Sequence, residues 1–256
     1  MPTSTVLITG ASGGIGFAVA KRFASAGAEL ILHAHRNLAA VHELRETIQR
    51  QGGKAEVITA DFSQSDAAET LCRHVMNLTN PIDVLVNAAG LDLMVPAISS
   101  LPFDQKLQQI MQTDLFVPIQ LSRQIGKQMQ EQRRGTIVFF GWNGVDYGWQ
   151  GETAQLYGAA KGALLGFSRS LAEDLAPDVV VRCLLLGWIK TRWGEKLSDG
   201  LERYYAADSR RNRWGTPEEV AATIEFLASE EAKYIDGIGL RLDGEKRSFI
   251  PVERVH

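Results

Sequence analysis

The chain of 256 residues is 45% hydrophobic and 22% charged, with a net charge of −3. This ordinary composition argues against a disordered or membrane-bound protein, and the weak charge supplies no field to hold nucleic acid. A chain of this length can bury one sizeable core, so we expect a single domain over residues 1–256. The opening residues MPTSTVLITG resemble neither an export signal nor a membrane span, and we expect a cytoplasmic protein.

Short aliphatic runs alternate with longer amphipathic stretches along the chain. In chain order, strands are expected at 5–9, 29–34, 55–60, 83–88, 136–140, 179–186 and 238–243. The segments between them place apolar residues at helical spacing, and several end with glycine, a helix-end signal. This alternation predicts an α/β fold, a Rossmann-like doubly wound parallel sheet of about seven strands with helices on both faces.

Residues 187–216 contain no clear strand. They directly follow a predicted strand, and open α/β sheets bind ligands at the carboxyl ends of their strands. We therefore expect this segment to form a lid over a substrate.

The two cysteines, Cys72 and Cys183, have no spacing typical of a disulfide framework or a metal cluster. We expect both to be buried as small apolar residues in a reducing compartment, and no metal site.

A glycine-rich turn joins the first predicted strand to the first predicted helix in VLITGASGGIGFAVAKRF. Glycine allows a tight turn and lets the backbone approach a pyrophosphate closely. The helix that follows offers unpaired N–H groups and a partial positive charge to an anion. The turn therefore predicts a dinucleotide site.

TGASGGIG (9–16) resembles the nucleotide motif of the short-chain dehydrogenase/reductase family. NAAG (87–90), YGAAK (157–161) and LGWIKT (186–191) resemble three further motifs of that family, and the last third of the chain also resembles its C-terminal portion. The resemblance covers nearly the whole chain in the right order. It implies an oxidoreductase that moves a hydride between a nicotinamide nucleotide and a carbonyl or alcohol substrate.

The cofactor preference follows from the end of the second predicted strand. An acidic residue there would bind the ribose 2′-OH of NAD, whereas an arginine accommodates the 2′-phosphate of NADP. The sequence LHAHRN offers Arg36 and no carboxylate, with Ser12 and His35 as further donors, so it favours NADP(H) over NAD(H). The alternative is an exposed Arg36 beside NAD. The resemblance implies a cofactor set of Gly10, Ser12, Gly14, Ile15, Gly16, Arg36, Asp61, Phe62, Asn87, Gly90, Tyr157, Lys161, Ile189 and Thr191.

Tyr157 and Lys161 are the candidate acid–base pair. They lie one helical turn apart and project from one helix face. A nearby lysine cation favours the phenolate and tunes tyrosine toward proton transfer. By resemblance, the tyrosine exchanges a proton with the substrate oxygen, and the lysine also holds the nicotinamide ribose.

The family's catalytic serine has no clear counterpart. Counting forward from Gly135 places it at Trp142, and counting back from Tyr157 places it at Gly144; no serine lies between Ser122 and Ser168. The Asn143 amide is our preferred replacement for polarising the carbonyl, with the Trp142 indole and the Thr153 hydroxyl as alternatives.

Asp114 occupies the position of a family asparagine, in MQTDLF. An ionised carboxylate could hold a water beside Lys161; it would favour the lysine cation but disfavour the Tyr157 phenolate. The sequence leaves the net effect open. The alternative is a helix N-terminal carboxylate that only meets backbone N–H groups.

Four tryptophans lie on loops that the family uses around its substrate, which predicts an apolar or ring-containing small molecule, although some of them could simply pack the loops. These are Trp142, Trp149, Trp188 and Trp193. The resemblance also implies a homodimer or homotetramer through helices around 113–131 and 155–175. Two other functions remain open: a nucleotide-binding protein with little activity, and a non-redox enzyme.

Overall fold

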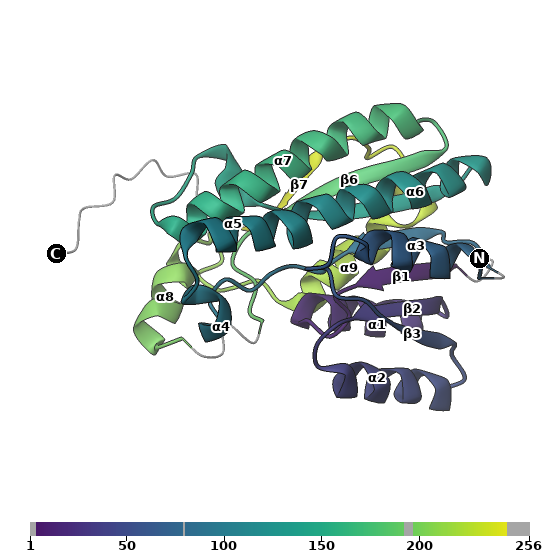
Figure 1. Ribbon diagram of the computed structural model, residues 1–256, viewed down its shortest axis with the longest axis horizontal. Coiled ribbons are helices and arrows are strands. Elements are labelled where there is room, and N and C mark those ends of the chain that lie inside the picture. The colour runs from purple at the N-terminus through teal and green to yellow at the C-terminus, as the bar shows by residue number, and fades with distance from the viewer. Residues whose placement is uncertain (1–3, 79, 192–196, 245–256) are drawn as a thin grey trace.

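The computed structural model describes residues 4–78, 80–191 and 197–244 (Figure 1). Seven parallel strands form one sheet in the order β3-β2-β1-β4-β5-β6-β7. Their bounds are β1 Thr5–Thr9, β2 Glu29–Ala34, β3 Ala55–Thr59, β4 Val84–Asn87, β5 Gly135–Trp142, β6 Val179–Leu186 and β7 Gly239–Leu242. The predicted fold class is confirmed, and every expected strand is present. The largest boundary difference is in β5, which continues to Trp142 because it pairs with β6 along its whole length.

Helices cover both faces of this sheet. Helices α1, α2 and α9 pack on one face, and α3, α6 and α7 pack on the other (Figure 1). The helix bounds are α1 Gly14–Ser25, α2 Leu38–Arg50, α3 Ala67–Met76, α4 Pro96–Ser99, α5 Phe103–Met111, α6 Val117–Glu131, α7 Glu152–Leu175, α8 Asp199–Ala207 and α9 Pro217–Leu227. Helix α7 thus begins one turn earlier than the start near Gln155 that the sequence suggested.

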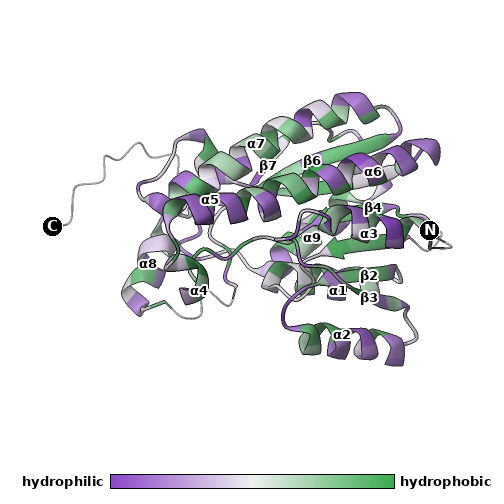
Figure 2. Cartoon of the chain, in the orientation of Figure 1, coloured by the Kyte–Doolittle hydropathy of each residue, from purple (hydrophilic) through white to green (hydrophobic). Residues whose placement is uncertain are grey.

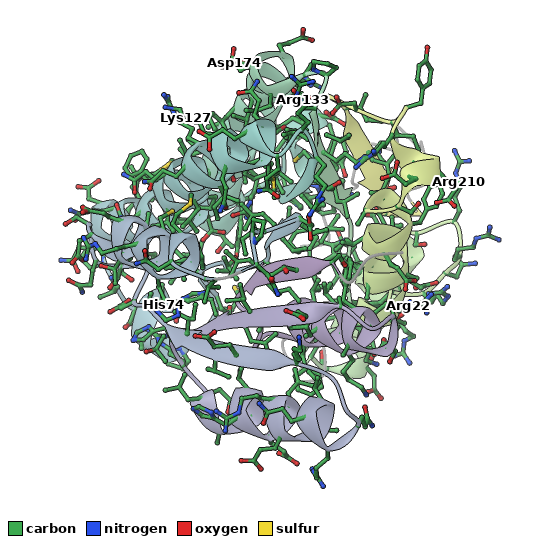
Figure 3. All side chains as sticks on the ribbon, turned by 90° about the vertical axis from the view of Figure 1, so that its right-hand side faces the viewer. Arg22, His74, Lys127, Arg133, Asp174 and Arg210 are labelled. Carbon is green, nitrogen blue, oxygen red and sulfur yellow. The ribbon has the colours of Figure 1, made fainter. Side chains whose placement is uncertain are left out.

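Two hydrophobic cores lie on the two faces of the sheet. In β1, Leu7 faces one core while Val6 and Ile8 face the other, and all three are fully buried. Because central parallel strands are covered on both sides, their sequences are apolar throughout rather than alternating. Figure 2 shows these apolar strands between helices whose outer faces are hydrophilic, and Figure 3 shows charged side chains such as Lys127 and Asp174 projecting outward.

Strand β1 lies between β2 and β4, so the strand order reverses beside it. Chain connections leave the neighbouring carboxyl ends of β1 and β4 in opposite directions at such a point, which opens a crevice for ligands. The glycine turn follows β1, and residues 88–91 follow β4. The topology therefore places these two segments at the entrance of the expected site.

A single helical run extends from α5 into α6 through a π-helical turn, η1, at Gln112–Phe116. Pro118 explains why the regular helix is interrupted: it has no N–H to offer the carbonyl of Asp114, four residues earlier. Asp114 thus lies inside a long helical run. It is not the helix N-terminal carboxylate that the sequence left open as an alternative.

Candidate active site

The glycine turn packs directly against the segment after β4. Gly10 has a φ of +66°, and a Cβ there would lie 2.6 Å from the Cα of Ala89. A Cβ on Gly16 would collide with the Gly10 carbonyl oxygen. Only glycine satisfies both the backbone conformation and the spacing, so the turn stays tight.

The N-terminus of α1 is available to an anion. No side chain caps it, and its first turn contains no acidic residue. Gly14 lies against Thr191, since a Cβ on Gly14 would be 3.2 Å from the Thr191 Cβ. The β1 turn and the segment after β6 therefore meet here, and a glycine-lined, uncapped helix start fits a pyrophosphate. Ile189 is held nearby by a β-bridge to Gly215.

His33, in β2, supports this turn and was missed by the sequence analysis. Its Nδ1 accepts a hydrogen bond from the Gly10 N–H (3.3 Å), which leaves Nε2 to donate to the Ala60 carbonyl (3.0 Å). The imidazole also stacks on Phe62, with ring centroids 4.1 Å apart. Burial lowers the pKa of His33 to about 4, so the ring is neutral at physiological pH. The only available signal was a polar residue inside the apolar run LILHA.

The end of β2 leaves Arg36 exposed. The His35 side chain contacts Asp61, with its Nδ1 3.3 Å from the carboxylate. Asp61 also accepts hydrogen bonds from the backbone and hydroxyl of Ser63. Arg36 is therefore a solvent-exposed cation just after β2, while the Asp61 carboxylate already accepts hydrogen bonds.

Asn87 ends β4 in a buried position. Its Nδ2 donates to the Ser122 hydroxyl (3.1 Å), while its Oδ1 has no hydrogen-bond donor within the described part of the chain. Gly90 lies beyond it, and a Cβ there would be 3.1 Å from Asp114 Oδ2. The segment after β4 thus runs closely past Asp114.

Tyr157 and Lys161 lie on α7 and are linked through that same segment. The Tyr157 hydroxyl donates to the Leu91 carbonyl (2.7 Å), and the Leu91 N–H donates to Asp114 Oδ1 (2.7 Å). The other carboxylate oxygen, Asp114 Oδ2, lies 2.9 Å from Lys161 Nζ. Asp114 is 1% exposed. Burial raises the pKa of Tyr157, and the Asp114 and Asp92 carboxylates raise it further.

The two positions at which the sequence placed the family serine are in contact. Trp142 is the last residue of β5, and its indole covers Gly144, where any Cβ would collide with it. The same ring approaches Gly158, next to Tyr157 in α7. Asn143 lies between the two positions and is 4% exposed. Trp142 and Asn143 therefore lie at the strand end that adjoins the tyrosine helix.

The other aromatic side chains form a cluster that joins α8 to the strand-end loops. Trp188 is central, with its ring centroid 5.8 Å from Trp149, 4.1 Å from Tyr205 and 5.8 Å from Trp214. The Trp188 indole N–H donates to Asp208 (3.3 Å). Trp149 and Trp188 thus belong to this cluster, whereas Trp142 contacts Gly144. Trp193 lies outside the described residues.

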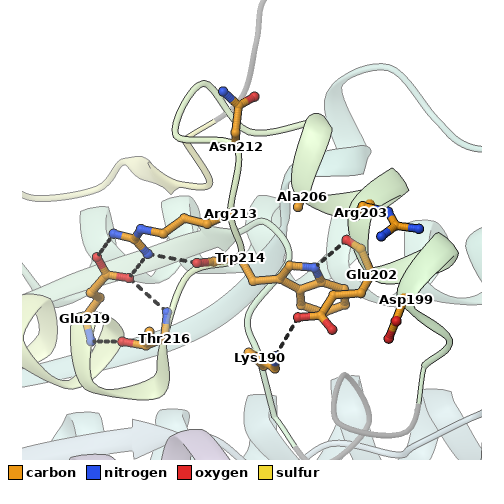
Figure 4. Close-up of a pocket in the computed structure, with 10 residues that line it drawn as sticks. All are labelled: Lys190, Asp199, Glu202, Arg203, Ala206, Asn212, Arg213, Trp214, Thr216 and Glu219. Carbon is orange, nitrogen blue, oxygen red and sulfur yellow. Dashed lines mark hydrogen bonds and ion pairs between the residues drawn. The ribbon is translucent and has the colours of Figure 1, made fainter.

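A cavity of about 720 Å³ lies between α8 and the start of α9 (Figure 4). Lys190 pairs with Glu202, and Arg213 pairs with Glu219, so most of the charge that lines it is neutralised locally. Neither Tyr157 nor Lys161 lines this cavity. Its chemistry therefore differs from that of the acid–base pair, although Lys190 belongs to the same loop as Thr191.

The two cysteines and the side chains that could ligate a metal are further candidates for a reactive centre in the part of the chain that the structure describes. Both cysteines are buried, and burial raises the pKa of Cys72 to about 12 and of Cys183 to about 11, so neither is a ready nucleophile. Within residues 4–78, 80–191 and 197–244, no cluster of three His, Cys, Asp or Glu side chains could hold a metal. No helix in those ranges is both long and apolar enough to cross a membrane.

Comparison with known proteins gives matches along most of the chain. Residues 4–202 match the family model described as short chain dehydrogenase. The 3-oxoacyl-(acyl-carrier-protein) reductase FabG of Aquifex aeolicus is 33% identical and covers 93% of this chain and 95% of its own length. The short-chain reductase protein NovJ of Streptomyces niveus is 32% identical, with coverage of 94% and 93%.

Solved structures give the same result. A double mutant of a Serratia marcescens short-chain dehydrogenase/reductase superposes with a TM-score of 0.84 at 26% identity, covering 94% of this chain and 96% of its own. A putative NAD(P)-dependent gluconate 5-dehydrogenase from Beutenbergia cavernae, with bound NADP at low occupancy, gives 0.83 at 30% identity, with coverage of 94% and 95%.

The buried His33 predicts a specific dependence of stability on pH. Its pKa is about 4 in the folded chain and about 6.5 when unfolded, so between these values the unfolded chain binds more protons. The contribution of neutral His33 to the free energy of unfolding is complete above about pH 6.5. It is lost as the pH falls toward 4, by about 3 kcal/mol in all. We expect the free energy of unfolding of the His33→Gln variant, measured with urea, to lack this pH-dependent loss. Equal losses in variant and parent between pH 7 and 4.5 would contradict the assignment.

Proposed function

The chain belongs to the short-chain dehydrogenase family, and from this premise we propose that it is an NADP(H)-dependent oxidoreductase that interconverts a carbonyl group and an alcohol. One observation carries the proposal: the nucleotide turn and the acid–base tyrosine, Tyr157, converge on residues 88–91. Gly10 packs on Ala88 and Ala89, and Tyr157 and Asp114 both hydrogen-bond to Leu91. A proton-transfer group therefore lies beside the place where the dinucleotide enters.

Different residues of the site would bind the nucleotide and transfer the proton. The uncapped start of α1 and the glycine turn would hold the pyrophosphate, and Arg36 would receive the 2′-phosphate. The nicotinamide, when bound, supplies or accepts a hydride. As the resemblance to the family implies, we assign Ile189 and Thr191 to its carboxamide and Lys161 to its ribose. The Tyr157 hydroxyl donates its hydrogen bond to the Leu91 carbonyl, and with substrate present it would donate to the substrate oxygen instead and give that oxygen its proton.

The substrate that we propose is an apolar or ring-containing carbonyl compound. The aromatic side chains of Trp142, Trp149 and Trp188 at the strand ends support this choice. The similarity to FabG adds a 3-oxoacyl thioester as one candidate of the same apolar class. A lid at residues 187–216, a cytoplasmic location and a homo-oligomer through the helices around 113–131 and 155–175 remain parts of the proposal.

Turnover of NADPH tests the proposed function directly. We expect NADPH oxidation with at least one member of a panel of cyclic ketones, aldehydes and 3-oxoacyl thioesters. In the Tyr157→Phe variant kcat should fall by about 10²–10⁴, because the proton donor is lost. The matched control is Tyr234→Phe, which removes a fully exposed hydroxyl and should leave kcat unchanged.

Two results would contradict the function. If Tyr157→Phe retained full kcat, proton transfer by this residue would be wrong. If NADPH bound tightly and no panel member turned over, the preferred reading would become a nucleotide-binding protein with little oxidoreductase activity, or a non-redox enzyme.

The cofactor preference depends on one exposed cation. We expect Arg36→Ala to weaken NADPH binding at least about tenfold, as the loss of one phosphate contact implies, while NADH binding changes little. Fluorescence titration of both nucleotides measures this. Arg50→Ala is the matched control, since Arg50 is an exposed arginine at the far end of α2. Equal weakening of NADPH and NADH binding by Arg36→Ala would contradict a 2′-phosphate contact.

Asn143 is our proposed donor to the substrate carbonyl. Removing one such donor typically lowers kcat by about 10²–10³, so Asn143→Ala should do so with little change in KM. Gln150→Ala, which truncates an exposed amide in the same loop, is the control. An unchanged kcat in Asn143→Ala would shift the role to the Trp142 indole or the Thr153 hydroxyl.

A further inference from the structure

Asp114 is a buried carboxylate that lies in direct contact with the acid–base pair. Its Oδ2 is 2.9 Å from Lys161 Nζ, and its Oδ1 accepts the Leu91 N–H at 2.7 Å. A carboxylate that is 1% exposed is tolerated only when its charge is compensated and its oxygens are hydrogen-bonded. Both conditions are met, so Asp114 and Lys161 form a closed pair of opposite charges.

This pair offsets the influence that the Lys161 cation would otherwise exert on Tyr157. A free ammonium close to a phenol favours the phenolate, but here the Lys161 charge is balanced by Asp114 at hydrogen-bond distance. The Leu91 carbonyl acts in the same direction, because it accepts the phenolic proton and so stabilises the protonated form.

The other groups that face Tyr157 come from the segment after β4. The Asp92 carboxylate adds to the effect of Asp114, and the Leu93 amide opposes it. Burial is the largest contribution, and together these influences raise the pKa of Tyr157 well above its usual range. The sequence left the net effect of Asp114 open, and the geometry now gives it a sign.

We propose that Asp114 is a positioning residue that keeps Tyr157 protonated and thereby biases the site toward carbonyl reduction. The bias toward reduction rests on the proposed function, whereas the protonation of Tyr157 does not. In the proposed reduction, the substrate carbon would gain a hydride from a bound reduced nicotinamide, and the carbonyl π pair would move to oxygen. That oxygen takes the Tyr157 proton, and the phenolate regains a proton from solvent. Oxidation requires the phenolate at the start, the form that Asp114 disfavours.

Titration of Tyr157 in the chain without nucleotide tests the inference independently of turnover. The protein has five tyrosines, and a ¹³C label at the ζ carbon gives each a resonance that moves on ionisation. The resonance missing from Tyr157→Phe identifies Tyr157. We expect it to ionise at higher pH than Tyr234, which is fully exposed. Ionisation at or below the pH of Tyr234 would overturn the proposal.

Asp114→Asn supplies the second arm of the experiment. The amide oxygen can still accept the Leu91 N–H, but the charge is gone, so the Tyr157 midpoint should fall by about one to three pH units. Glu152→Gln is the matched control. Glu152 is a carboxylate on α7, the helix that also carries Tyr157, and it pairs with Lys106. This substitution should leave the Tyr157 midpoint unchanged.

An unchanged midpoint in a folded Asp114→Asn protein would overturn the role of Asp114. If that variant did not fold, the comparison of Tyr157 with Tyr234 in the parent chain would still decide whether the tyrosine is held protonated. Because no substrate or nucleotide takes part, a failure of NADPH turnover would count against the proposed function and leave this titration intact.

Discussion

The close approach of Gly10 to the backbone of Ala88 and Ala89 is the constraint on which the rest of the site depends. It brings the turn after β1 against the segment after β4, at the point where the strand order reverses. Leu91 then lies within reach of both α7 and the π-helical turn, so its N–H and C=O connect Asp114 to Tyr157. A side chain at Gly10 would separate these segments and disturb nucleotide binding and acid–base chemistry together.

Those parts of the fold that depend on local pattern were predictable from sequence. Strand positions, the parallel sheet and the glycine turn follow from apolar runs, their alternation with helices and the spacing of Gly10, Gly14 and Gly16. The pairing of Tyr157 with Lys161 on one helix face follows from their spacing. The individual elements and motifs are set by residues close together in the chain, and the regular alternation of strands with helices then implied the parallel sheet.

Contacts between distant segments were not predictable in the same way. The role of His33 requires Gly10, Ala60 and Phe62 to meet around one ring, which no local pattern indicates. Counting along the sequence placed the family serine at two different positions, Trp142 and Gly144. In the fold the Trp142 indole packs on Gly144, so the two positions are in contact. The sign of the Asp114 effect likewise needed the direct contact with Lys161, and Asp114 lies in a π-helical turn that the sequence did not indicate.

The most direct measurement is the pH dependence of kcat in both directions for one carbonyl–alcohol pair, between about pH 6 and 9. If Tyr157 is held as a proton donor, reduction should be nearly independent of pH, whereas oxidation should rise about tenfold per pH unit across the whole range as the rare phenolate becomes more populated. An oxidation rate that reaches a plateau near neutral pH would mean that the phenolate forms readily, and it would contradict the account.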